Sequence, residues 1–234
     1  MGVYSNTEIR KAIEEGHIVY HPRIDKHIAG SSIDVTLGIW FYRMERPSQG
    51  GFYNPLDEQA VKQYFDGPHK AVIHKDWAKK NGRTLFVNIP PEHPIIVLRP
   101  GERILGHTHE FIGIKAPGTS TLQARSTWGR NGVSVCLDAG WGDPGYINRW
   151  TMEIYNMNQH ESVVLPIGER VAQMVFHDTG PVSGEYKKLS GKYQSDKSDD
   201  LKAIIKNWTP DQMLPRGYKD KRRMPIKIPG LRKE

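Results

Sequence analysis

The sequence predicts a mainly β fold with a short N-terminal helix and a few peripheral helices. Two observations support this prediction. Beyond the first helix the chain breaks into short segments separated by Gly, Pro, Asn and Asp, a spacing typical of antiparallel strands joined by turns. The chain has 234 residues, enough for one well-packed domain, and it contains no internal repeat.

The N-terminal helix is indicated by its capping residues. Ser5 and Glu8 have the Ser-x-x-Glu spacing of a capping box, and Gly16 provides a stop signal. An apolar face at helical spacing lies between them, formed by Ile9, Ala12 and Ile13.

The rest of the chain is expected to form two short helices and several short strands. We expect short helices over residues 57–65, inside an insertion, and 199–208. No linker is recognised before about residue 195, so we expect one β-rich domain over 1–195 and a basic C-terminal extension over 196–234. The expected strands cover residues 32–37, 84–89, 94–98, 119–124, 150–155 and 170–176.

The formal net charge of +7 is concentrated at the C-terminus, where residues 214–234 hold eight basic side chains against two acidic ones. Such a run is usually a solvated tail, and nucleic-acid or partner binding is the alternative. The single cysteine, Cys136, excludes an internal disulfide, and no apolar stretch approaches membrane-spanning length. We therefore expect a soluble, cytoplasmic protein that makes no membrane contact.

Residues 124–156 contain most of the side chains that could carry chemistry. Arg125, Ser126, Thr127 and Arg130 place guanidinium groups and hydroxyls within six residues, which suits phosphate oxygens but also fits ordinary surface arginines. The turn from Asp143 to Tyr146 could likewise be a simple hairpin turn or could hold a sugar between its carboxylate and its ring.

The expected strand over 150–155 contains a glutamate whose surroundings the spacing leaves open. Alternation places Thr151, Glu153 and Tyr155 on one face, opposite an apolar face. Glu153 would then point to solvent by default. If its face instead lines a closed pocket, desolvation would raise the pKa of Glu153 and suit it to proton transfer near neutral pH.

Zinc-assisted deamination is disfavoured by the cysteine count. Zinc nucleobase deaminases use a Pro-Cys-x-x-Cys segment, which a single cysteine cannot supply, and His107 and His109 have no partner ligands in the sequence. A Rossmann fingerprint and a Walker A loop are also absent. We expect no metal site built by the protein, so phosphate binding must depend on side chains and turn amides.

Several motifs, in order, resemble those of the dCTP deaminase and trimeric dUTPase superfamily, closest to the deaminases that include the dUMP-forming type. Their order makes the resemblance far more specific than any one motif, and it extends from the N-terminal helix to about Gln194. The motifs are Ser31–Gly38 (SSIDVTLG), residues 98–102 with 106–111, residues 125–130 (RSTWGR), 139–146 (AGWGDPGY), 168–176 (GERVAQMVF) and 191–194 (GKYQ).

The resemblance implies a distorted β-barrel or jelly roll and a homotrimer whose active sites are shared between subunits. It implies that Asp143 binds the sugar 3′-hydroxyl, that Tyr146 packs on the deoxyribose, and that Arg130 lies beside the catalytic carboxylate. The residues implied to contact the triphosphate, the base or the reacting water are Arg125, Ser126, Thr127, Ala139, Thr151, Gln173, Tyr186, Lys192 and Gln194. Mg²⁺ would come bound to the triphosphate.

Glu153 separates the two activities of the superfamily, because the deaminases have a glutamate at this position and plain dUTPases generally lack it. The implied mechanism needs no zinc. A water held by Glu153, Ser126 and the Ala139 carbonyl adds to C4 of cytosine, and Glu153 moves the protons. A positioned acid–base group of this kind contributes about 10²–10⁴ in rate.

A second reaction is implied by Ala139-Gly140-Trp141 and by Gln173, which resemble bifunctional members that convert dCTP to dUMP. A plain dUTPase and a catalytically silent relative remain the alternatives. Asp138 replaces the usual threonine near the base, which leaves a modified pyrimidine open as substrate. Asp196 replaces a usual glutamine, and the chain from about Asp199 onward has no recognised counterpart.

Overall fold

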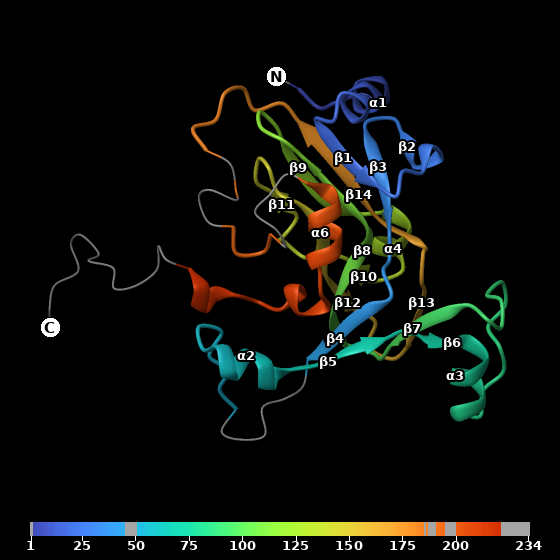
Figure 1. The fold of residues 1–234 in the computed structure, drawn as a ribbon. Coiled ribbons are helices and arrows are strands. Elements are labelled where there is room, and N and C mark those ends of the chain that lie inside the picture. Colours follow the sequence, from blue (N-terminus) through green and yellow to red (C-terminus); the bar gives the residue numbers. More distant parts are fainter. Residues whose placement is uncertain (1, 45–50, 185, 187–190, 195–199, 221–234) are drawn as a thin grey trace, which may run out of the picture.

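The structure is a computed structural model that describes residues 2–44, 51–184, 186, 191–194 and 200–220. Strands dominate it, and every named strand pair is antiparallel (Figure 1). The predicted mainly β fold with peripheral helices is therefore confirmed.

The largest sheet has six strands in the order β10-β12-β8-β4-β5, with β1 also paired to β8. The long β8 is its central strand and pairs with β12, β4 and β1. The register between β12 and β8 shifts between Arg149 and Thr151, where the Thr108 hydroxyl accepts a hydrogen bond from the Trp150 N–H at 2.8 Å. The strands are β1 (Ile18–His21), β4 (Trp40–Met44), β5 (Phe65–Lys70), β8 (Arg103–Ile114), β10 (Val133–Ser134) and β12 (Ile147–Asn156).

Two smaller sheets complete the β structure. One has five strands in the order β11-β9-β14-β3-β2, and the other has three in the order β13-β7-β6. The sheets are open, since the paired strands form no closed ring within the described ranges; of the distorted barrel or jelly roll that the resemblance implies, the fold takes the form of packed sheets. The strands are β2 (Ile28–Ala29), β3 (Ser32–Thr36), β6 (Val72–Ile73), β7 (Pro94–Leu98), β9 (Thr119–Ala124), β11 (Trp141–Gly142), β13 (Val163–Pro166) and β14 (Arg170–His177).

The core lies between the two larger sheets. Ile112 and Ile154 reach it from the six-stranded sheet, and Leu122, Met174 and Phe176 reach it from the five-stranded sheet. All five residues of β3 are buried, so both faces of that strand are covered. Its polar residues Ser32, Asp34 and Thr36 alternate with Ile33 and Val35, and each polar side chain is bound inside the protein, by Gln173, Arg170 and Glu110 respectively.

The N-terminal helix α1 (Asn6–Glu14) is confirmed, with both hydrogen bonds of the capping box between Ser5 and Glu8. Carboxylate caps also begin α2 and α6, at Asp57 and Asp200. The other helical elements are α2 (Glu58–Tyr64), α3 (His74–Lys80), α4 (Ser126–Arg130), α6 (Leu201–Asn207) and the 3₁₀ turns η1 (Asp25–His27), η2 (Pro210–Met213) and η3 (Gly217–Lys219).

The strand expected over residues 84–89 is wrong, because this segment is a loop that packs on α3. The Phe86 N–H donates to His74 Nε2 at 2.9 Å, and the two rings stack at 5.2 Å. Asn88 has a φ of 65°, which breaks any extended run. Aromatic contacts with the helix therefore take the place of strand pairing.

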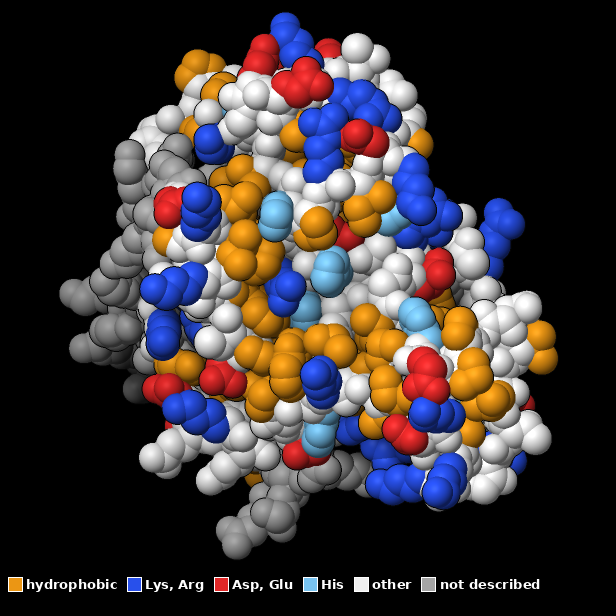
Figure 2. All heavy atoms as spheres, turned by 45° about the vertical axis from the view of Figure 1, so that its right-hand side comes forward, with side chains coloured by type: hydrophobic (Ala, Val, Ile, Leu, Met, Phe, Trp, Pro, Cys, Tyr) orange, Lys and Arg blue, Asp and Glu red, His pale blue; other side chains and the backbone are white. Residues whose placement is uncertain are grey.

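The surface of the described body carries both signs of charge. Figure 2 shows Lys and Arg side chains interspersed with Asp and Glu around a band of hydrophobic side chains on one face. The terminal residues 221–234, where most of the excess positive charge lies, are outside the described residues. In the described ranges, no helix is both long and apolar enough to cross a membrane.

Candidate active site

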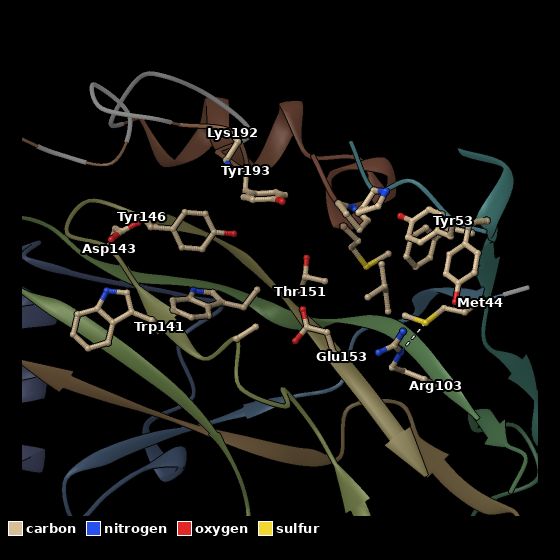
Figure 3. A pocket seen from close by; sticks show the side chains of 18 of the residues that line it. Met44, Tyr53, Arg103, Trp141, Asp143, Tyr146, Thr151, Glu153, Lys192 and Tyr193 are labelled. Carbon is tan, nitrogen blue, oxygen red and sulfur yellow. Dashed lines mark hydrogen bonds between the residues drawn. The ribbon is translucent and has the colours of Figure 1, made fainter. Parts of the chain in front are cut away.

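A cavity of about 620 Å³ lies over β12 and β8, beneath residues 191–194 (Figure 3). Strand β12 supplies its floor, and the turn before β12 supplies one end. The opposite end comes from the insertion around α2 and from the C-terminal extension. Seven residues that the sequence analysis selected line it together: Ala139, Asp143, Tyr146, Thr151, Glu153, Tyr186 and Lys192.

Glu153 lies in the middle of this cavity and does not take the solvent-facing position that alternation gives by default. Met152 and Ile154 point into the core, which turns Thr151 and Glu153 into the cavity (Figure 3). Its Oε2 atom is buried and has no hydrogen-bond partner within the described part of the chain. Burial raises the pKa of Glu153 to about 7, against smaller opposing effects of a backbone hydrogen bond and the nearby Arg103.

The end of the cavity formed by Asp143 and Tyr146 is a tight turn, as the sequence indicates. The Tyr146 N–H donates to the Asp143 carbonyl at 3.0 Å. The Tyr146 ring makes edge contacts with Trp150 at 5.3 Å and with Tyr186 at 5.1 Å. Burial raises the pKa of Tyr146, so its hydroxyl stays neutral. The turn and sugar-binding interpretations are therefore compatible, because the turn leaves Asp143 on the cavity wall.

The segment 191–194 crosses above the cavity and is held by hydrogen bonds to its neighbours. The Tyr193 N–H donates to the Tyr186 hydroxyl at 3.1 Å, and the Tyr193 carbonyl accepts from Asn148 Nδ2 at 2.8 Å. Gln194 accepts from the Ile147 N–H at 3.3 Å and braces the start of β12, outside the cavity lining. The departure at Asp196 lies outside the described residues.

The phosphate motif lies elsewhere in the single chain. Ser126, Thr127 and Arg130 are on α4, directly after Arg125, and none of these four residues lines the cavity that contains Glu153. Arg130, expected beside the catalytic carboxylate, is therefore not its neighbour within one chain. The cation that acts on the pKa of Glu153 is Arg103.

Arg125 and Gln173 form a second polar group on the five-stranded sheet. Arg125 pairs with the Asp34 carboxylate at 3.4 Å, and Arg170 pairs with the same oxygen at 2.9 Å. Gln173 donates to the Ser32 hydroxyl at 3.3 Å. The sequence-selected residues thus divide into a group around Glu153 and a group around α4 and β14.

The residues that close the cavity opposite Asp143 were not predicted from the sequence. An aromatic-rich insertion was the only signal for part of this set, and nothing in the sequence pointed to the residues of the extension. The missed residues are Met44, Tyr53, Tyr64, Phe65, Arg103, Met213 and Pro215.

His107, considered as a metal ligand, has a structural role. Its Nε2 accepts from the Trp40 N–H at 3.2 Å, and its Nδ1 lies 2.7 Å from the Thr108 carbonyl. Burial lowers the pKa of His107 to about 3, so the ring stays neutral. Over the described ranges, no three His, Cys, Asp or Glu side chains are grouped to hold a metal ion.

Comparisons with known proteins identify the family. A model described as dCTP deaminase-like matches residues 3–179. The dCTP deaminase, dUMP-forming, of Methanopyrus kandleri is 32% identical over 202 residues, covering 84% of this chain and 92% of that protein. The protein of the same name from Methanobrevibacter smithii is 29% identical over 197 residues, covering 82% and 90%.

Among solved structures, the 2′-deoxycytidine 5′-triphosphate deaminase from Agrobacterium tumefaciens matches with a TM-score of 0.49 at 21% identity. The match covers 76% of this chain and 49% of that chain, so the present chain spans about half the length of this relative. The family model alone spans well over half of the residues, and the matched region contains the motifs from Ser31 to Phe176. The chain belongs to the dCTP deaminase-like family.

Proposed function

We propose that this protein deaminates dCTP by hydrolysis and releases dUMP, with Glu153 as the acid–base residue. The observation that carries the proposal is the position of the Glu153 carboxylate, which faces the cavity. Its Oε2 is buried and has no hydrogen-bond partner among the described residues. A pKa of about 7 lets one carboxyl group both accept and donate protons near neutral pH.

In the proposed reaction, Glu153 accepts a proton from water as the water oxygen adds to C4 of cytosine. The same proton then passes to ring N3, which gives a tetrahedral carbon with hydroxyl and amino substituents. Glu153 next accepts the hydroxyl proton and transfers it to the amino group, and ammonia leaves. Cytosine and water thus give uracil and ammonia, and Glu153 returns to its starting form.

The sugar and phosphates would lie along the rest of the cavity. Asp143 and Tyr146 line one end of the cavity, where Asp143 would accept from a sugar hydroxyl and the Tyr146 ring would pack on the deoxyribose. Lys192 provides a cation for the phosphates at the same end. Mg²⁺ would enter as part of the nucleotide triphosphate, since no carboxylate cluster for a resident ion is found in the described residues.

The separation of the α4 group from Glu153 supports a shared site in a homotrimer. Ser126, Arg130 and the neighbouring Arg125 would reach the Glu153 cavity of an adjacent copy, where they would contact the water and the phosphates. In this arrangement two copies complete one active site. The protein would act on free nucleotides in the cytoplasm.

Diphosphate release as the second step is favoured by the relatives, which are named as dUMP-forming. The Ala139-Gly140-Trp141 motif resembles the bifunctional members, and Gly140 fits tightly here because a Cβ atom there would lie 2.1 Å from the Leu122 carbonyl oxygen. A water placed by Asp143 would attack the α-phosphate of dUTP, giving dUMP and diphosphate. A dUTPase without deaminase activity is the second candidate. It is less favoured because diphosphate release from dUTP does not require a desolvated carboxyl group at Glu153.

One assay tests these alternatives. The protein is incubated with Mg²⁺ and either dCTP or dUTP, and ammonia and diphosphate are measured. Ammonia, diphosphate and dUMP from dCTP are expected. Ammonia with dUTP as the final product would restrict the activity to deamination. Diphosphate from dUTP without ammonia from dCTP would overturn the deaminase assignment, and no product from either nucleotide would identify a silent relative.

A further inference from the structure

The C-terminal segment 200–220 packs on the domain beside the cavity. Its helix α6 lies over the six-stranded sheet (Figure 1), where the buried Ile204 contacts Phe111 of β8 and Ile147 of β12. The first turn of α6 is capped by Asp200, which accepts from the Lys202 N–H at 3.0 Å. Burial of this isoleucine removes apolar surface from water, so the contact anchors the segment.

Trp208 provides a second anchor where α6 ends. Its ring lies 4.8 Å from the His107 ring. The Arg149 guanidinium lies 4.7 Å from the Trp208 ring and 4.8 Å from the Phe111 ring. Cation–π contacts with a desolvated guanidinium are among the stronger ones. The chain after α6 is therefore fixed to strands β8 and β12, the two strands that form the cavity floor.

The turn that follows contributes to the cavity wall. Met213 is buried against Tyr42 and Phe65, and Met213 and Pro215 both line the cavity that contains Glu153. The Tyr42 hydroxyl donates to the Asp211 carboxylate at 2.5 Å, which holds the turn against β4. The extension thus forms part of the enclosure around the reacting carboxylate.

Arg216 then links the extension to the segment above the cavity. The Arg216 backbone N–H donates to the Tyr193 hydroxyl at 3.0 Å, and the guanidinium Nη1 donates to the Lys192 carbonyl at 2.8 Å. Its Nη2 lies 3.4 Å from the Asp211 carbonyl, so one guanidinium bridges the extension and the segment 191–194. The Lys192 ammonium also pairs with Asp220 at 3.0 Å.

We propose that residues 200–220 are a working part of the active site and that Arg216 is a positioning residue. Arg216 fixes the backbone of Lys192 and the ring of Tyr193 over the nucleotide. This inference rests on the proposed function and adds a segment that the sequence motifs do not include. A phosphate-binding segment that is ordered before substrate arrives loses less conformational entropy on binding. The guanidinium contacts should therefore act on nucleotide affinity more than on the chemical step.

The test compares Arg216→Ala and Arg216→Lys with the control Lys80→Ala, which removes an exposed cation at the end of α3, outside the cavity lining. Ammonia release from dCTP is measured at several concentrations. Arg216→Ala should raise KM about tenfold, as expected for the loss of charge-assisted hydrogen bonds, with kcat changed less than about threefold. Arg216→Lys should recover part of the lost affinity, because an ammonium still donates to a carbonyl. The control should match the wild type.

A second measurement is independent of turnover. Hydrogen exchange of the peptide that contains residues 191–194 should be faster in Arg216→Ala than in the control, without nucleotide. Equal exchange and equal KM in these two variants would overturn the proposal, and so would a fall in kcat alone with a lowered melting temperature. A wild type that releases no ammonia, yet shows the exchange difference and weaker dCTP binding in Arg216→Ala, would refute the proposed function but not the role of Arg216.

Discussion

Two glutamates on neighbouring strands share a buried setting and differ in their partners. Glu110 of β8 is fully buried, and its two carboxylate oxygens accept from the Thr36 N–H at 2.9 Å and the Thr36 hydroxyl at 2.7 Å. Glu153 of β12 is partly buried, and its Oε2 has no partner among the described residues. Burial raises the pKa of both carboxyl groups.

Burial alone therefore does not distinguish a structural carboxylate from a reactive one. Glu110 binds the β3 backbone across 74 residues of sequence, and both of its oxygens are used within the fold. Glu153 lines the cavity, and its Oε2 has no hydrogen-bond partner among the described residues. A desolvated group that faces a cavity and has no partner is a site for chemistry, whereas a desolvated group with partners is part of the core.

The largest effect is expected from Glu153→Gln. Ammonia release from dCTP should fall by about 10²–10⁴, because the amide cannot accept and return protons. The binding constant for dCTP should change little, since the shape of the side chain is kept. Glu110→Gln is the matched control and should retain turnover. Equal losses in both variants would remove the distinction between the two glutamates.

Truncation to alanine should affect stability, and here the larger effect is expected at Glu110 and not at Glu153. Glu110→Ala leaves the Thr36 N–H and hydroxyl buried without their acceptor, which should lower the free energy of unfolding by about 2–3 kcal/mol. Glu153→Ala loses only a hydrogen bond of the side chain with its own backbone, so it should lower the free energy of unfolding less. Urea denaturation of both variants checks this difference, and a larger loss in Glu153→Ala would contradict it.

The smallest effect is the pH dependence that Glu153 adds to the free energy of unfolding. Its pKa is raised from 4.5 to about 7 in the folded protein, so the unfolded chain loses this proton first. The stability of the wild type should fall relative to Glu153→Gln as the pH rises from about 4.5 to about 7, and the difference should then stay constant. Such a shift corresponds to roughly 3 kcal/mol at most, and water in the cavity reduces it to about 1–2 kcal/mol.

Urea denaturation of the wild type and Glu153→Gln at pH 4, 5.5, 7 and 8 measures this difference. The contribution of Glu110 is common to both proteins and cancels. A constant difference over the whole range would show that the Glu153 carboxyl has an ordinary pKa, which would weaken its assignment as the group that moves protons.

Local signals in the sequence predicted local structure well. The capping box at Ser5 and Glu8 and the alternation around Glu153 were both confirmed, because each depends on residues only a few positions apart. The expected strand at residues 84–89 failed because His74 and α3, which lie earlier in the chain, bind Phe86 and keep the segment out of a sheet. The choice between a closed barrel and packed open sheets was left open by the sequence, since strand pairing is set by contacts between distant segments.

The sequence by itself determined the family motifs, the face of β12 that carries Glu153 and the turn that carries Asp143. Only the tertiary structure decided that this face is enclosed, because Met44, Tyr53, Arg103 and Met213 come from segments far away in the chain. Alternation specifies which side chains share a face, and the cover over that face depends on what packs there. The local sequence around Glu153 fits either a solvent-facing or a pocket-lining side chain. The tertiary packing buries the carboxyl and so raises its pKa to about 7.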